Sequence, residues 1–155
     1  MPGTSEWLSS LKDRIRSGED CTDDLDDLFQ VTFSGDDDEV QEASWCLARM
    51  AAAGCSDMRL SSILMSMRDV SDPVSENVCW GLGELASSGI GGEDELGYAV
   101  RMHASERVSL RAMAVWCIGR LRDAGISSDA SDAVLRDAAA DENPMVRACA
   151  IHGLP

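Results

Sequence analysis

The sequence is poor in the features that would place it in a membrane, outside the cell or on nucleic acid. Its 155 residues contain no run of 18 apolar residues, and the N-terminal segment MPGTSEWLSSLKDRIRSG has no apolar core of the kind found in signal peptides. One of its 13 basic residues is a lysine, and 28 acidic residues leave a formal net charge of −15. Binding to nucleic acid depends on Lys and Arg that neutralise phosphates. We therefore expect neither a membrane nor a nucleic-acid partner.

The acidic residues are mostly aspartates, 18 Asp against 10 Glu. A surface rich in Asp and poor in Lys suits a high-salt cytosol, where salt screens the repulsion between like charges. A G+C-rich genome, which favours Arg codons, explains the shortage of lysine equally well. The six cysteines, many for a salt-adapted protein, form no C-x-x-C pair and no metal-ligand spacing. We expect reduced, mostly buried thiols, a cytoplasmic location, and no metal or cofactor.

Three stretches of the chain share one pattern: WCLARMAAAG from Trp45, WGLGELASSG from Trp80 and WCIGRLRDAG from Trp116. Each has Trp, any residue, Leu or Ile, Ala or Gly, and a Gly nine positions after the Trp. Shorter segments between them carry apolar residues at helical spacing and recur at offsets of 35, 36 and 35 residues. Two independent patterns with one period indicate an internal repeat.

Each repeat is expected to be a short helix, a tight link and a longer helix. The predicted pairs are 22–33 with 37–53, 57–69 with 72–88, 93–103 with 105–124, and 129–139 with 143–154. Residues 4–17 form a further helix that caps the stack, with Leu8, Leu11 and Ile15 on one side.

Residues at the helix ends support these boundaries. Asp72 and Asn143 are expected as N-caps because each precedes a proline at the first helical position. Ser105 and the acidic run GDDDE are expected to begin two other long helices. Left-handed glycines should end the first three long helices, at Gly54, Gly89 and Gly125.

No strand pattern competes with the helical one. Helical hairpins of this length, stacked so that each buries its apolar face against its neighbours, form an α-solenoid. The sequence predicts an all-α fold, a right-handed α-α superhelix of about four helical hairpins plus an N-terminal capping helix. We expect one monomeric domain over residues 1–155, with the cap at 4–17 and repeats at 22–54, 57–89, 93–125 and 129–155.

The second helices carry a recognisable motif, in LRAMAVWCIGRL from Leu110, VRACAIHGL from Val146 and DPVSENVCWGLGEL from Asp72. These segments resemble HEAT repeats, specifically the short kind also found in phycobilisome lyase proteins, in which the second helix looks like V-R-x-A-A-A-W-A-L-G-x-L. The first unit, EVQEASWCLARM, departs by placing Glu39 where the family has Val. The family's repeated Arg is matched by Arg111 and Arg147, so we expect a discontinuous Asp–Arg ladder. The resemblance covers about residues 22–154 and implies a HEAT-like superhelix, a fold that serves many roles.

The tryptophans are expected to point away from the core of their own hairpin. At about 100° per residue, Trp80 and Trp116 lie roughly 170° from the middle of the apolar arc of their helices. The resemblance implies that second helices line a concave surface, so the tryptophans would form a row along a groove, flanked by residues four positions away. The candidate groove residues are Trp45, Trp80, Trp116, His152, Gln41, Arg49, Glu76, Glu84 and Arg120.

Two interpretations of this row remain open. The tryptophans either wedge between neighbouring second helices and stabilise the curvature, or they face a ligand as interface anchors do. Three exposed tryptophans in a row would be an unusual apolar liability without a partner.

Other motifs indicate no catalytic or metal chemistry. His103 occupies a core slot of a first helix, which predicts a buried structural imidazole. The acidic runs CTDDLDDL and SGDDDEV lack the Gly and terminal Glu spacing of a calcium loop. No nucleophile motif and no phosphate-binding glycine loop occurs.

These observations favour a non-catalytic scaffold or adaptor that binds a peptide or protein surface in the groove. An alternative, suggested by the resemblance alone, is a phycobilisome-lyase-like or other enzyme-accessory subunit. A DNA-repair glycosylase of the HEAT-like type would need a basic groove, which the net charge disfavours.

The last repeat differs from the others because its second helix reaches Pro155 three residues past His152. Terminal repeats of solenoids normally cover their open apolar face with polar residues, and nothing polar follows Leu154. The edge with Val146, Ala150 and Leu154 on its core side is therefore expected either to continue into a longer array or to pack against another chain. A short native helix whose few apolar atoms tolerate water is the third possibility.

The dependence of thermal stability on salt concentration tests the origin of the acidic charge. If the net charge is an adaptation, the thermal unfolding midpoint should rise steeply between low salt and about 1 M KCl, because screening relieves repulsion. Circular dichroism at 222 nm during heating measures the midpoint. An unchanged midpoint across this range would favour codon bias instead.

Overall fold

A computed structural model describes residues 3–153, with side chains up to Ile151. Within residues 3–153 the chain forms nine α-helices and one short 3-10 turn, with no strand, so the expected all-α class is confirmed. The helices are α1 (Thr4–Arg16), α2 (Leu25–Ser34), α3 (Asp37–Ala52), α4 (Met58–Ser66), α5 (Asp72–Ala86), α6 (Glu93–Met102), α7 (Val108–Asp123), α8 (Asp129–Ala138) and α9 (Pro144–Gly153), and the turn η1 (Thr22–Asp24) precedes α2.

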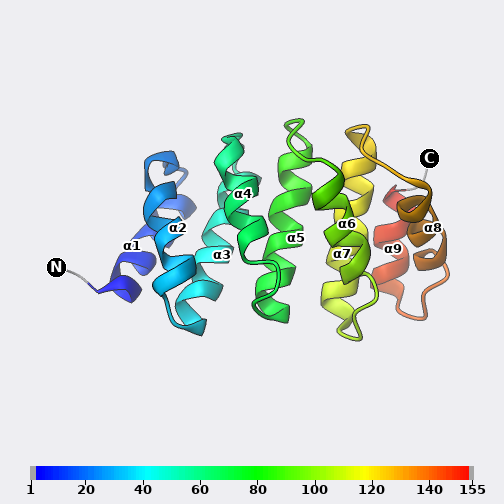
Figure 1. The fold of residues 1–155 in the computed structure, drawn as a ribbon, viewed down its shortest axis with the longest axis horizontal. Coiled ribbons are helices and arrows are strands. Elements are labelled where there is room, and N and C mark those ends of the chain that lie inside the picture. The colour runs from blue at the N-terminus through cyan, green and yellow to red at the C-terminus, as the bar shows by residue number, and fades with distance from the viewer. Residues whose placement is uncertain (1–2, 154–155) are drawn as a thin grey trace.

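The helices stack as four hairpins in a row (Figure 1). The second helices of the hairpins, α3, α5, α7 and α9, pack on one another in that order, and α1 packs on α3 at one end. The first helices, α2, α4, α6 and α8, each pack on the second helix of their own hairpin. The architecture is a helical-repeat superhelix with a capping helix, as expected.

The core runs between the two layers of helices. In the second hairpin, Leu60 and Leu64 of α4 are fully buried, as is Val78 of α5. Removing such a side chain from water stabilises the fold by about 1.5–3 kcal/mol. The cap buries Leu8, Leu11 and Ile15 in the same continuous core, as predicted.

Several predicted helix boundaries are confirmed in detail. Asp36 caps α3 by accepting a hydrogen bond from the Glu39 backbone N–H, and the Glu39 side chain accepts one from the Asp36 N–H. This capping box gives Glu39 a structural role at the start of α3. Asn143 accepts a hydrogen bond from the Met145 N–H at the start of α9. The predicted glycine stops have left-handed backbone, with φ of 101° at Gly54, 77° at Gly89 and 88° at Gly125.

Two predicted helix starts are wrong. The N-cap of α5 is Ser71, whose hydroxyl accepts from the Val74 N–H, and Asp72 is already helical. The helix α7 begins at Val108, because the Ser105 hydroxyl accepts from the Arg107 N–H and holds a separate turn before the helix.

The prediction that His103 is buried is also wrong. His103 follows the last residue of α6 and is partly exposed, because the helix ends before this position can turn toward the core. Tyr98 of α6 is 1% exposed and belongs to the core, although the helical pattern in the sequence did not predict it there. Its hydroxyl is the one buried side-chain polar atom without a hydrogen-bond partner in the described part of the chain.

The six cysteines are unpaired, and four of them are buried, as predicted. Burial raises the pKa of the Cys46 and Cys117 thiols to about 12, so they stay protonated at neutral pH. Among the described helices, none combines the length and the apolar character that crossing a bilayer requires.

Polar contacts between neighbouring repeats join residues a little over 30 positions apart. The Asn77 amide of α5 donates to the Ser44 hydroxyl of α3 at 2.9 Å, and Ser61 of α4 donates to Glu95 of α6 at 3.0 Å. Such bonds set the register between adjacent hairpins because each pairs similar positions of consecutive units. Further examples are Ser5 with Glu39, Arg59 with Asp26, Arg107 with Glu76, and Arg120 with Ser87.

One bidentate ion pair joins the third and fourth repeats. Arg111 donates through Nε to Asp141 Oδ2 at 2.9 Å and through Nη2 to Oδ1 at 3.1 Å, and both side chains are 14% exposed. Arg111 also donates to the Ser105 carbonyl, and Arg147 donates to the Asp141 carbonyl. The position of the second repeat that corresponds to Arg111 holds Ser75. The expected Asp–Arg ladder is therefore confined to the end of the stack that contains α7 and α9.

Val146 and Ala150 lie on the core side of α9, as predicted. Both side chains are fully buried, because they point back into the core of the fourth hairpin. Leu154 lies outside the described residues.

We predict that Asp141→Asn lowers the free energy of unfolding by about 1–3 kcal/mol at pH 7, the usual range for charged hydrogen bonds. Hydrogen bonds from Arg111, then from the Asn143 N–H, hold the pKa of Asp141 below its ordinary value of 3.8. The ionised carboxylate therefore stabilises the fold above that value, and this contribution is lost as pH falls through the folded-state pKa. Urea unfolding at pH 7 and pH 3 should show the variant and the parent converging in acid. Asp137→Asn, at an exposed position of α8, is the control and should have little effect at pH 7.

Candidate functional site

Trp116 lies directly on the backbone of the preceding second helix. A methyl group added to Gly83 of α5 would overlap Cζ3 of the Trp116 indole and lie 3.0 Å from Cε3 and Cη2. The absence of a side chain at Gly83 therefore makes room for the ring. The indole is nevertheless only half buried, so the part of it that does not pack on α5 reaches solvent.

A small residue occurs three positions after each of the three tryptophans Trp45, Trp80 and Trp116. Gly83 follows Trp80 by three, and the same position holds Ala48 in the first unit and Gly119 in the third. Both Ala48 and Gly119 are buried.

Trp80 and Trp116 also line a shared hollow on the face of the second helices that points away from the first helices. The hollow has a volume of about 390 Å³ and spans α5, α7 and α9. Its lining is mainly apolar, which suits an apolar side chain of a ligand. The lining residues are Glu76, Trp80, Ser109, Ala112, Met113, Trp116, Met145 and Cys149.

The charged residue that lines the hollow, Glu76, is already paired. Glu76 accepts hydrogen bonds from Arg107 Nε, at 2.7 Å, and from the Ser109 hydroxyl. The Arg120 guanidinium lies 5.6 Å from the Trp116 ring centroid and donates to the Ser87 hydroxyl. The charge of Glu76 is therefore compensated by Arg107, while Arg120 contacts the face of Trp116 and, within the described part of the chain, keeps an uncompensated charge beside the hollow.

Trp45 has a different environment from the other two tryptophans. Lys12 Nζ lies 5.6 Å and the Arg16 guanidinium carbon 5.0 Å from its ring centroid, both from the capping helix α1. These cations cover the ring and interact favourably with its π face. The predicted row is therefore divided into a cation-covered Trp45 and the Trp80–Trp116 hollow.

The remaining predicted groove residues do not line the hollow. Gln41 is exposed on α3, and Arg49 and Glu84 are half buried one turn after their tryptophans. His152 is part of α9, but its side chain lies outside the described part of the chain.

Sequence reasoning missed residues that lie three and seven positions before the tryptophan slot. Met113 and Cys149 occupy the first of these positions, and Ser109 and Met145 the second. Positions i−3 and i−7 share a helix face with i, so the signal was available, but the prediction counted only positions four away. Lys12 and Arg16 were missed because the capping helix has no tryptophan motif to align.

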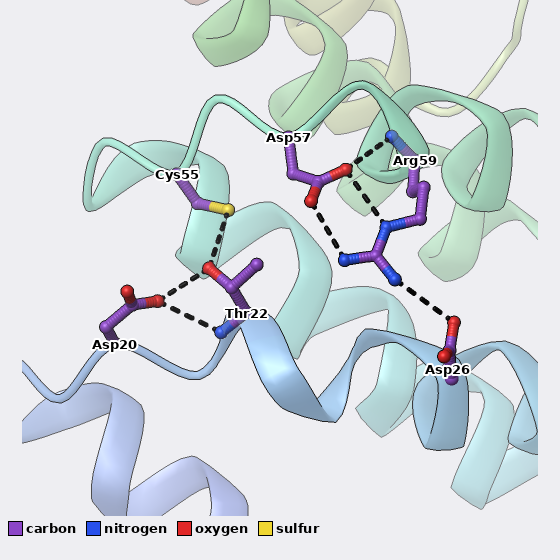
Figure 2. A network of polar contacts seen from close by, with 6 residues as sticks. All are labelled: Asp20, Thr22, Asp26, Cys55, Asp57 and Arg59. Carbon is purple, nitrogen blue, oxygen red and sulfur yellow. Dashed lines mark hydrogen bonds and ion pairs between the residues drawn. The ribbon is translucent and has the colours of Figure 1, made fainter.

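A second, more polar hollow of about 550 Å³ lies at the other end of the stack, where the end of α1 meets the links before α2 and α4. Figure 2 shows the polar network beside it. The Thr22 hydroxyl donates to Asp20 at 2.6 Å and lies 3.6 Å from Cys55 Sγ, while Asp57 accepts two bonds from the Arg59 guanidinium. The bonds from Thr22 lower the pKa of Asp20, and the Arg59 side chain lowers that of Asp57.

This network ties the first two repeats together rather than forming a reactive centre. Arg59 extends it by donating to Asp26 at 3.2 Å. Residues 3–153 contain no cluster of three or more His, Cys, Asp or Glu side chains arranged to hold a metal ion. Nothing in the described residues positively indicates catalysis.

Comparisons with known proteins add no assignment. A scan against protein-family models found no match, and a search of curated proteins found no significant relative. The functional argument therefore depends on the geometry of the chain itself.

We predict opposite effects for two Gly→Ala substitutions inside helices. Gly83→Ala should lower the free energy of unfolding by about 1–3 kcal/mol, because the methyl group displaces the Trp116 ring. Gly97→Ala is the matched control in α6, where an added methyl meets nothing within 4 Å. It should stabilise the protein by about 0.5–1 kcal/mol through helix propensity alone. Urea unfolding measures both, and equal stabilisation by the two changes would show that Trp116 does not need the glycine.

Proposed function

We propose that the chain is a non-catalytic interaction module that holds an apolar side chain of a peptide or protein partner in the Trp80–Trp116 hollow. The single observation that carries this proposal is the open apolar hollow on three consecutive second helices. Large aromatic side chains that line a pocket are the residues that contribute most to binding energy at protein interfaces.

The composition of the hollow supports a protein ligand over a small polar metabolite. Two indole rings and two methionines line it, and Met is common on surfaces that accept varied apolar partners. Among the lining residues Glu76 is the one that carries a charge, and it is paired with Arg107. A volume of about 390 Å³ suits one or two large apolar side chains better than an extended chain.

The HEAT-like resemblance of the second helices is part of this proposal. Stacked hairpins present an extended surface on which several units contribute to one site, as α5, α7 and α9 do here. A partner longer than one side chain would extend from the hollow toward Trp45 and Arg49 along the same face. A cytoplasmic setting fits six unpaired thiols.

A displayed library of random peptides tests the proposal directly. Peptides selected on the native chain should contain a large apolar residue, and their binding should shift the indole N–H resonances of Trp80 and Trp116. Removing an anchor of this kind costs about 2 kcal/mol or more, so Trp80→Ala should weaken the selected peptide at least tenfold in fluorescence polarisation.

Phe33→Ala is the matched control, because Phe33 is a 70% exposed aromatic residue on α2, outside the hollow. It should leave the affinity unchanged. Met113→Glu gives a second variant that charges the hollow without removing a ring from a packed position, and circular dichroism verifies that each variant folds. Peptides that bind the Trp80→Ala and Met113→Glu variants as tightly as the parent would refute the proposed site.

A further inference from the structure

The last described second helix exposes an apolar side chain at a position that every earlier unit buries. Ser44, Cys79 and Val115 each directly precede a tryptophan, and all three are 0% exposed. Ile151 directly precedes His152 in the fourth unit and is 61% exposed. The hydrogen bond from Asn77 to Ser44 shows what normally covers this position, which is the second helix of the next repeat.

The outer side of α9 is apolar beyond this one residue. Met145 is 52% exposed, and Ala148 is exposed between it and Ile151 along the helix. The matching position of the first and third units holds Asp38 and Ser109, so Met145 is an apolar residue where two other units are polar. No acidic residue occurs within Pro144–Gly153.

Charge is distributed very unevenly along the stack. Residues 1–100 carry 21 acidic and six basic side chains, whereas residues 101–155 carry seven of each. Because Arg101 belongs to α6, the chain up to the end of α6 carries a net charge of −14, and the α7–α9 end, from residue 103 onward, carries −1. Two copies of the chain can approach through their nearly neutral α7–α9 ends without the repulsion that a contact between two acidic ends would produce.

We propose that the outer face of α9 binds the same face of a second copy of this chain. The contact is a two-fold dimer in which Met145, Ala148 and Ile151 of each copy cover those of the other. A symmetric contact of this kind needs only a patch that complements itself, and an apolar helix face without acidic residues meets that condition.

The opposite end of the stack does not offer a matching surface. The exposed side of α1 carries Glu6, Ser9, Ser10 and Asp13, which are polar or charged. A head-to-tail contact would place the apolar face of α9 against these groups and would grow into an open filament. The symmetric contact avoids both outcomes.

Sedimentation equilibrium of the 155-residue chain tests the proposal. The apolar face is smaller than that of standard interfaces, so we expect a weak dimer with half-association at about 10–500 µM. At about 0.15 M ionic strength, where charges beyond about 8 Å are screened, the average mass should rise from 16.6 kDa toward twice that value.

Ile151→Glu should weaken the dimer at least tenfold and leave the helical content unchanged, because the side chain is mostly exposed. Met58→Glu is the matched control, since it places the same charge on a 76% exposed methionine at the start of α4, and it should dimerise like the parent. Ile151→Ser removes the apolar surface without adding charge and should also weaken association.

A mass that stays at 16.6 kDa up to about 1 mM overturns the proposal, and so does association that Met58→Glu weakens as much as Ile151→Glu. A mass that grows past the dimer indicates head-to-tail contacts and overturns it as well. Met145 belongs to both the hollow and the proposed contact, but Ile151 does not line the hollow, so the Ile151 variants test the dimer without changing the peptide site.

Discussion

The close approach of neighbouring second helices is the constraint on which the stack depends. Gly81 of α5 lies near the backbone of α3, since a methyl group there would lie 3.3 Å from the Ala48 Cα. Gly83, two residues further along α5 and on another side of the helix, receives the Trp116 ring. Small residues bring the backbones together, and a large ring fills the space beside them. Wider spacing would leave a void over Gly83 and separate the inter-repeat hydrogen bonds.

This packing means that the two interpretations of the tryptophans do not exclude each other. The part of Trp116 over Gly83 serves as a wedge, and the rest borders the hollow. A ring fixed by the neighbouring helix loses little conformational freedom when a ligand arrives, which lowers the cost of binding. Rigid aromatic residues are favourable anchors for this reason, and the proposed function relies on that rigidity.

Much of the fold could be predicted from the sequence because the signals were local and repeated. Helical periodicity, the capping box at Asp36 and the glycines at Gly54, Gly89 and Gly125 each act within a few residues. The errors arose where tertiary contacts decide. The coverage of Trp45 by Lys12 and Arg16 depends on how α1 docks, and the exposure of His103 depends on where α6 ends. Of the candidate site, the facing of Trp80 and Trp116 followed from helix geometry, whereas the contributions of Met145 and Cys149 required the neighbouring helix in place.

The inter-repeat hydrogen bonds have a consequence for how the chain folds and changes over time. They join residues a little over 30 positions apart, so each hairpin is held by its immediate neighbours. Chains with such short-range contacts fold quickly, because little loop-closure entropy is lost before a contact forms. Folding can begin at any adjacent pair of hairpins and spread in both directions. Duplication or loss of a whole hairpin in a gene would likewise leave the contacts between the other hairpins unchanged. The number of hairpins is therefore free to vary, whereas the packing within and between hairpins stays the same.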